Sequence, residues 1–233
     1  MNKKSTKREA QDIQKLVSLY KDKQYLFNIF LKGVTDVLST HPLLIPHLHS
    51  VKNRLKSVDS LEHKLYRKLQ DSKIKKVKFS IGTSNLFDEI QDLAGVRLLH
   101  LHTDQVGVIN NAILKIIKEQ NYTLVEGPIA NTWDDEYRAL FDKLKIESKP
   151  RDSMYTSIHY IVAANTTDKV RCEIQVRTLL EEVWGEVSHL VNYPEKTASL
   201  ACSEQLKVLA RVTSSGTRLV DSIFISKKEY DSL

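Results

Sequence analysis

The segment Cys172–Thr178, towards the C-terminal end of the chain, alternates strictly between apolar and polar side chains. Alternation with a period of two is the pattern of a β-strand, so the segment is expected to bury one face and expose the other. The polar face then carries an acid, an amide and a guanidinium in a row: Glu173, Gln175 and Arg177. A solvent-facing strand would show the same alternation, so a functional interpretation needs matching residues elsewhere in the chain.

The order of the other patterns predicts an α+β domain built on a mixed sheet. Alternating segments indicate strands over residues 95–102, 122–129, 155–163 and 169–177. Helical spacing indicates helices over residues 7–40 (with a second helical stretch beginning near Tyr25), 51–55, 61–69, 105–120, 133–146, 179–192 and 197–226. Ser57 or Asp59 is expected to cap the helix over residues 61–69.

Composition excludes several classes of protein. No stretch of the 233 residues approaches the ~20 apolar residues of a membrane-spanning helix. The basic first residues are not followed by an apolar segment, so no secretory signal is expected. The two cysteines have no metal-type spacing, and a reducing cytoplasm is the expected compartment. The sequence also lacks the motifs of phosphate loops, dinucleotide-binding folds, zinc proteases and serine hydrolases.

Positive charge is concentrated in one segment. From Lys52 to Lys78 the chain has 10 Lys and Arg against 3 acids, a net charge of +7 in a chain whose formal net charge is +6. On a helix, Lys64 lies within one turn of Lys68, so these cations are expected to face an anionic partner. Nucleotide phosphates, nucleic acid or an acidic protein would each suit, and a solvated helix face accounts for about half of the lysines.

Two further motifs offer matching chemistry. Asp92-Leu93-Ala94-Gly95-Val96-Arg97 places an acid before a strand, a glycine that permits close backbone approach, and an arginine. Residues 150–159 place Tyr155 and His159 on one strand face. The tyrosine suits stacking on a base, although a tyrosine at the edge of the core would look the same, and the histidine fits a structural hydrogen-bonding role. Asp92 and Glu173, from separate strands, could share Mg²⁺, which predicts a phosphoryl-transfer site.

In these motifs, from about Val51 to Tyr193, the sequence resembles the synthetase domain of RelA/SpoT-type alarmone synthetases, also called GTP pyrophosphokinases. The resemblance implies a nucleotidyltransferase-like mixed β-sheet flanked by helices. It also implies transfer of pyrophosphate from ATP to the 3′-hydroxyl of GDP or GTP, with Mg²⁺ as cofactor. A helical extension is expected over residues 1–50, the synthetase domain over residues 51–193, and a C-terminal helix over residues 194–233.

The resemblance also assigns roles to individual residues. Asp92 and Glu173 would bind the metal, and together with Arg97 they would form the catalytic group. Residues that would bind ATP share a basic helix or follow Asp92: Arg54, Lys56, Ser57, Lys64, Lys68 and Arg97. Residues that would bind the acceptor come from the two late strands: Arg151, Tyr155 (stacked on guanine), His159, Gln175 and Arg177.

Three departures from the family pattern concern the acceptor. Ser153 and Met154 replace an Asn-Gly pair, and Thr156 replaces an arginine. Two alternatives therefore stay open: a toxic relative that pyrophosphorylates the 3′ end of tRNA, and a non-catalytic RNA- or protein-binding module on the same fold. An apolar stripe in the last helix, which includes Leu219 and Ile223, predicts either packing on the sheet or a homo-oligomer.

Overall fold

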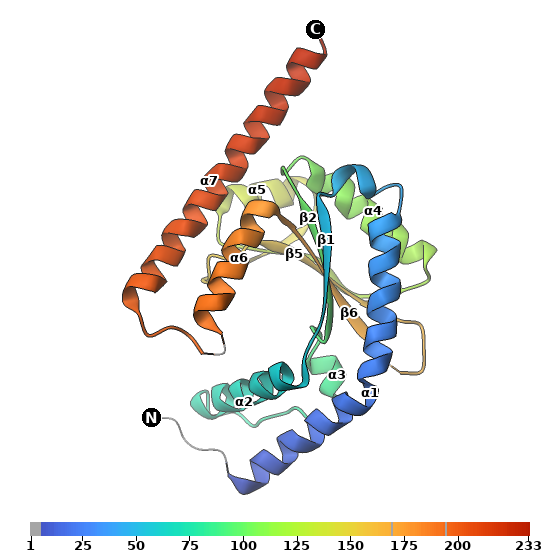
Figure 1. The fold of residues 1–233 in the computed structure, drawn as a ribbon, viewed down its shortest axis with the longest axis vertical. Helices are drawn as coiled ribbons and strands as arrows, with labels where there is room; N and C mark the ends of the chain where they lie inside the picture. The colour runs from blue at the N-terminus through green and yellow to red at the C-terminus, as the bar shows by residue number, and fades with distance from the viewer. Residues whose placement is uncertain (1–5, 169, 194) are drawn as a thin grey trace.

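A six-stranded mixed sheet forms the centre of the computed structural model, which describes residues 6–168, 170–193 and 195–233 (Figure 1). The strands lie in the order β1-β2-β6-β5-β3-β4, with β2–β6 and β3–β4 parallel and the other pairs antiparallel. Their bounds are β1 Ser50–Leu55, β2 Ala94–His100, β3 Thr123–Thr132, β4 Glu147–Pro150, β5 Ser157–Ala163 and β6 Arg171–Thr178. The predicted α+β class is confirmed.

Helices cover both faces of this sheet. Figure 1 shows α1 and α4 on one side, α6 and α7 on the other, and α2 beyond one end. Alternate residues such as Ile174, Tyr160 and Val96 are fully or almost fully buried against the α1–α4 side. The helices are α1 Lys7–Thr40, α2 Val58–Ile74, α3 Leu86–Glu89, α4 Gln105–Glu119, α5 Asp135–Lys143, α6 Leu179–Asn192 and α7 Leu200–Asp231.

The N-terminal part forms one continuous helix, α1, so the prediction of a second helical stretch from Tyr25 is wrong. Buried side chains recur along its whole length, from Ile13 through Tyr20 and Phe27 to Leu38, and give one unbroken apolar face. These side chains belong to the same hydrophobic core as the sheet.

The prediction of helix over residues 51–55 is also wrong, because this segment is strand β1. It pairs antiparallel with β2, with Lys52 opposite Arg97 and Arg54 opposite Gly95. The apolar spacing of five residues cannot distinguish a strand from a helix, and pairing with β2 decides between them. The helix that follows, α2, begins as predicted, with Ser57 as its cap.

The other predicted elements are confirmed within a few residues, but the strand expected from Tyr155 begins only at Ser157. The first β5–β6 pair is Ile158 with Val176, so Tyr155 has no backbone partner and lies before the strand. Strand β4 and the short helix α3 were not anticipated. Residue 169, where β6 was expected to begin, and residue 194 lie outside the described residues.

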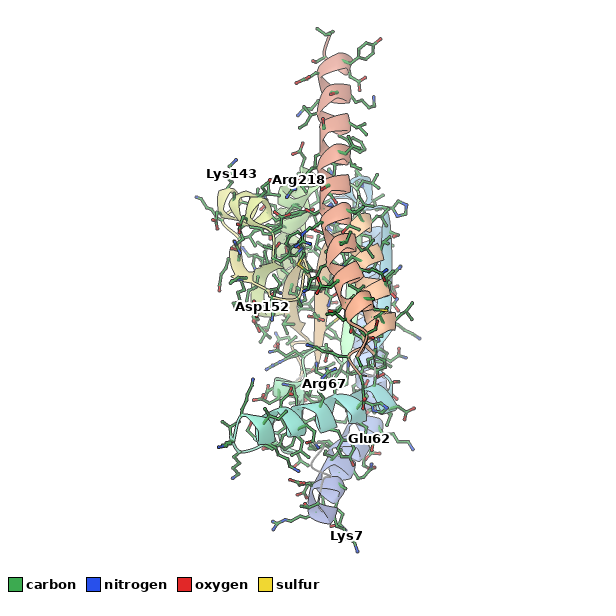
Figure 2. All side chains as sticks on the ribbon, turned by 90° about the vertical axis from the view of Figure 1, so that its left-hand side faces the viewer. Lys7, Glu62, Arg67, Lys143, Asp152 and Arg218 are labelled. Atoms are coloured by element: carbon green, nitrogen blue, oxygen red, sulfur yellow. The ribbon has the colours of Figure 1, made fainter. Side chains whose placement is uncertain are left out.

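Helix α7 lies along α6 and extends beyond the body of the molecule (Figure 1). Arg218 of α7 is labelled in Figure 2. It forms ion pairs with Asp134, the cap of α5 (2.5 Å), and with Glu136 of α5 (2.7 Å). Its buried residues are small, and the apolar stripe that includes Leu219 and Ile223 stays largely exposed instead of packing on the sheet. No helix among the described residues is long and apolar enough to cross a membrane.

Candidate active site

Polar side chains from four neighbouring strands share the face of the sheet that lies opposite α1 and α4. The register places Gly95 of β2 beside Glu173 of β6, and Gln175 between Arg97 of β2 and His159 of β5. Because side chains alternate along each strand, this register gathers the predicted residues on one surface.

Two adjoining cavities open on this face. The first, of about 470 Å³, is called the basic cavity, and its lining includes Lys52, Arg54, Lys56, Asp92, Arg97 and Glu173. The second, of about 170 Å³, is called the His159 cavity, and its lining includes Asn131, Lys149, Arg151, His159 and Glu173. Glu173 lines both, so its carboxylate stands where the two cavities meet. Two ligands bound in them would meet at that carboxylate.

Asp92 is held between Lys56, which lies in the link from β1 to α2 and not on the predicted basic helix, and Lys64 of α2. Its Oδ2 accepts a hydrogen bond from Lys56 Nζ (3.0 Å), and its Oδ1 accepts one from Lys64 Nζ (2.7 Å). Burial opposes ionisation, but the charges of the two lysines prevail and lower the pKa of Asp92 to about 2. Asp92 is therefore a permanent anion at neutral pH.

The backbone of Lys56 fixes this ion pair. Its N–H donates to the carbonyl of Leu93 (2.8 Å), and its carbonyl accepts from the hydroxyl of Tyr20 (2.6 Å). Lys56 is only 8% exposed, and burial lowers its pKa against the opposing effect of Asp92. The hydroxyl of Ser57 is used to cap α2. Among the described residues, neither Lys64 nor Lys68 lines either cavity, and only Lys64 contacts a residue that does, Asp92.

Glu173 belongs to a closed ring of hydrogen bonds. Its Oε1 accepts from His159 Nδ1 (2.6 Å), and its Oε2 accepts from Gln175 Nε2 (2.8 Å). His159 Nε2 contacts the hydroxyl of Tyr155 (3.0 Å), to which Arg177 donates (2.7 Å). Arg177 also donates to Gln175 Oε1 (2.5 Å), which closes the ring.

The ring sets the protonation of its members. Burial opposes ionisation of Glu173, but the hydrogen bonds from His159 and Gln175 hold its pKa below the usual value. The carboxylate can only accept, so His159 Nδ1 carries the proton of that bond. The four polar residues therefore orient Glu173 as an ionised group.

Tyr155 does not line either cavity but lies next to the His159 cavity through His159. Its ring has the guanidinium of Arg177 5.1 Å from the centroid and the ring of Trp184 6.4 Å away. At the other end of this cavity, Arg151 Nε donates to Asn131 Oδ1 (2.8 Å). Thr156, at the position of the family arginine, is buried and bonded to Thr132 (2.9 Å).

Two acids of α6 were not identified from the sequence. Arg97 NH1 donates to Glu182 Oε1 (3.1 Å) and to Glu186 Oε1 (2.5 Å). Glu182 is 4% exposed, and Glu186 lines the basic cavity. Helix α6 begins directly after strand β6, so its first turns lie over the polar face of the sheet. This direct connection is the sequence signal from which the two acids could have been predicted.

The carboxylate pair fits a magnesium ion. Asp92 and Glu173 both line the basic cavity, and no group of three or more potential ligands occurs among the described residues. Mg²⁺ is usually held by one or two carboxylates together with the phosphates of a substrate, so two acids beside a basic cavity suffice. Gly95 is paired with Glu173 and lines the same cavity, and a Cβ there would stand 3.7 Å from the carbonyl of Glu173, an ordinary contact. The backbone would therefore accept a larger residue at this position, and the effect of the glycine is to leave the cavity wider.

Residues 53–198 match the family model described as "Region found in RelA / SpoT proteins". One relative is the GTP pyrophosphokinase YwaC of Bacillus subtilis, which is 24% identical over 156 residues. That alignment covers 63% of this chain and 59% of YwaC, so less than two thirds of the relative is spanned.

Solved structures share the fold. Small alarmone synthetase 1 of Bacillus subtilis, bound to its product pppGpp, has a TM-score of 0.59 at 17% identity over 87% of this chain and 94% of that chain. The same enzyme bound to AMPCPP has a TM-score of 0.53 at 18% identity over 93% and 98%. The expected mixed β-sheet flanked by helices is confirmed, and these structures share its fold.

Proposed function

Because the chain belongs to the RelA/SpoT family, we propose that it transfers the β,γ-pyrophosphate of ATP to the 3′-hydroxyl of GDP or GTP. The products would be AMP and a (p)ppGpp-type alarmone. The observation that carries the proposal is the shared wall of the two cavities, because Glu173 stands between a cation-lined space and a second polar space. The nucleotides bound by the similar synthetase, AMPCPP and pppGpp, support the same pair of substrates.

The basic cavity would hold ATP. Four cations surround the space for a triphosphate: Lys52, Arg54, Lys56 and Arg97. Lys64 would act through Asp92, to which it donates a hydrogen bond. Such fixed charges stabilise the negative charge that accumulates on the transferred group. Mg²⁺ bound by Asp92 and Glu173 would polarise the phosphoryl oxygens of the donor.

The His159 cavity would hold the acceptor. Arg151 would bind its phosphates, and Tyr155 would stack on its base after a movement that opens its ring to the cavity. Gln175 and Arg177, as members of the ring, would hold Tyr155 and Glu173 in register. His159 keeps the carboxylate of Glu173 ionised and oriented.

The reaction is a displacement at the β-phosphorus of ATP. The 3′-oxygen of the acceptor forms a bond to the β-phosphorus, and the bond from that phosphorus to the oxygen that bridges it to the α-phosphorus breaks. AMP leaves with that bridging oxygen. The hydroxyl proton passes to the ionised carboxylate of Glu173. Because the pKa of Glu173 is held below its usual value, this carboxylate is a weak base, and it takes the proton only when the attack on phosphorus makes the hydroxyl more acidic.

The test offers γ-labelled ATP and Mg²⁺ to the purified protein with GDP, GTP, ATP or deacylated tRNA in parallel. Labelled guanosine product together with AMP is the expected result. Product formation in EDTA, or label transferred to none of the acceptors, would contradict the proposal.

The altered acceptor motif favours a second candidate, the pyrophosphorylation of a tRNA 3′ end. A tRNA would cross the surface and meet lysines that a nucleotide does not reach, so its binding would depend strongly on salt. Lys75 and Lys76 follow α2, Lys78 lies two residues further along, and none of the three lines the basic or the His159 cavity.

The discriminating variant is Lys75→Ser, Lys76→Asn and Lys78→Ser together; asparagine is chosen because Lys76 has a φ of 55°. Transfer to GDP or GTP should stay within about threefold, because exposed charges act over only ~8 Å at physiological salt. A large loss of transfer to tRNA with a shallower salt dependence would support the second candidate.

A further inference from the structure

Glu182 lies in the first turn of α6, over the polar face of the sheet. Thr178 caps this helix, and Glu181 completes the capping box, so the first turn is fixed relative to the end of β6. An acid in the first turn is also stabilised by the helix dipole. Glu182 is therefore a rigidly placed carboxylate that is 4% exposed.

Three cations from three strands converge on this carboxylate. Oε1 accepts from Lys52 Nζ of β1 (3.1 Å) and from Arg97 NH1 of β2 (3.1 Å), and Oε2 accepts from Arg177 NH1 of β6 (3.1 Å). Burial opposes ionisation, but Arg177, Arg97 and Lys52 hold the pKa of Glu182 below its usual value. Oε1 thus contacts β1 and β2, and Oε2 contacts β6.

The two arginines belong to different nucleotide sites. Arg97 lines the basic cavity, whereas Arg177 donates to Tyr155 and Gln175 in the ring that ends at Glu173. The side chain of Arg177 is only 3% exposed, and its sole ion pair among the described residues is with Glu182. Without that carboxylate, a buried guanidinium would lose its counter-charge.

We propose that Glu182 is a positioning residue for pyrophosphate transfer, which holds Arg97 in the donor site and Arg177 with Tyr155 in the acceptor site. The inference rests on the proposed function, which identifies the two cavities as donor and acceptor sites. Glu182 does not touch the reacting atoms in this arrangement. It acts through the two arginines, so its loss affects the binding of both nucleotides.

Glu186 provides a matched control on the same helix. It contacts only Arg97 among the cations named here, its side chain is 49% exposed, and it has no contact with Arg177. Glu182→Gln keeps the shape of the side chain but removes its charge and turns an amide towards the arginine donors. Glu186→Gln makes the same chemical change on the donor side alone.

The experiment titrates AMPCPP and GDP separately into the wild type and both variants, and measures kcat for pyrophosphate transfer. Glu182→Gln should weaken the binding of each nucleotide by about tenfold, because one charge-assisted hydrogen bond is lost at Arg97 and one at Arg177. Glu186→Gln should change the affinity for AMPCPP and leave that for GDP within about twofold.

A Glu182→Gln protein that is folded and binds GDP as tightly as the wild type would overturn the inference. If that variant does not fold, Glu182→Asp serves instead, because it keeps the charge but is one methylene shorter. It should still weaken the binding of at least one nucleotide. Unchanged binding of both nucleotides would overturn the inference. If the wild type transfers no pyrophosphate, the proposed function is refuted. If the wild type is active but the Glu182 variants bind both nucleotides as tightly as it does, only this inference is refuted.

Discussion

The replacement Asp92→Asn tests the electrostatics of the donor site through stability and activity together. The amide has nearly the same shape as the carboxylate, so packing changes little. The variant removes the anion between Lys56 and Lys64, which donate to its two oxygens at 3.0 Å and 2.7 Å. Two neighbouring cations, one of them buried, then lose their shared counter-charge.

The pKa of Asp92 gives the magnitude. It falls from 3.8 to about 2 on folding, which corresponds to ~2.4 kcal/mol of stabilisation at neutral pH. Since the side chain is 33% exposed, solvent screening reduces this to about 1–2 kcal/mol. For a chain of this size the variant should melt about 2–8 °C below the wild type.

The sign of the pH dependence follows from the lowered pKa. A carboxyl group with a depressed folded-state pKa stabilises fully above its unfolded value of 3.8 and loses that contribution as the pH falls towards 2. Urea denaturation from pH 8 to pH 3 should therefore give a constant difference between the two proteins down to about pH 5. Below that pH the difference should shrink.

The control is Asp36→Asn, which changes an exposed carboxylate of α1 that forms no ion pair in the part of the chain that the structure describes. It should leave both the free energy of unfolding and activity unchanged. Asp92→Asn should also lower pyrophosphate transfer by orders of magnitude, because a metal ligand typically contributes several kcal/mol to the transition state. Equal unfolding free energies for Asp92→Asn and the wild type, or an active Asp92→Asn protein, would refute the reasoning.

Three further predictions concern the acceptor site and assembly. In His159→Leu, the pKa of Glu173 loses the hydrogen bond that lowers it, so the acid limb of kcat against pH should move to higher pH; an unmoved limb would refute the role of His159. Tyr155→Ala should weaken acceptor binding by about ten- to a hundredfold and Tyr155→Phe by less, since stacking contributes ~1–3 kcal/mol per base; normal binding by the alanine variant, measured by calorimetry, would make the ring structural. The exposed apolar residues of α7 predict a homo-oligomer that Leu219→Lys with Ile223→Lys dissociates, and light scattering of the wild type at 26.7 kDa at high micromolar concentration would reject it.

The sequence predicted the polar face well because that face obeys local periodicity. Glu173, Gln175 and Arg177 alternate along β6 as expected, and Asp92 lies beside the basic residues Lys56 and Lys64. Periodicity alone does not bring these segments together; the resemblance to a family is what predicted that they share one site.

Other features depend on contacts between distant segments and leave no local pattern. Strand β1 is short, and its pairing with β2 overrides the spacing that suggested a helix. Glu182 shows no motif, since its importance comes from Lys52 and Arg97, which are 130 and 85 residues away along the chain. Lys68 had the expected residue type and spacing, but it lines neither of the two cavities in the described part of the chain.

The two cavities meet at Glu173, but their linings reach the two outermost strands of the sheet, which affects solubility as well as binding. The outermost strands are β1 and β4, and an outermost strand offers unpaired backbone groups to which another polypeptide can add. Lysine, arginine and proline on such strands discourage this addition, and β1 carries Lys52 and Arg54 whereas β4 ends in Lys149 and Pro150. The charges that we propose to bind phosphates thus also keep neighbouring molecules apart. We expect that replacing these charged residues with apolar ones would cause aggregation as well as loss of activity. Sedimentation measured alongside each activity assay would distinguish the two effects.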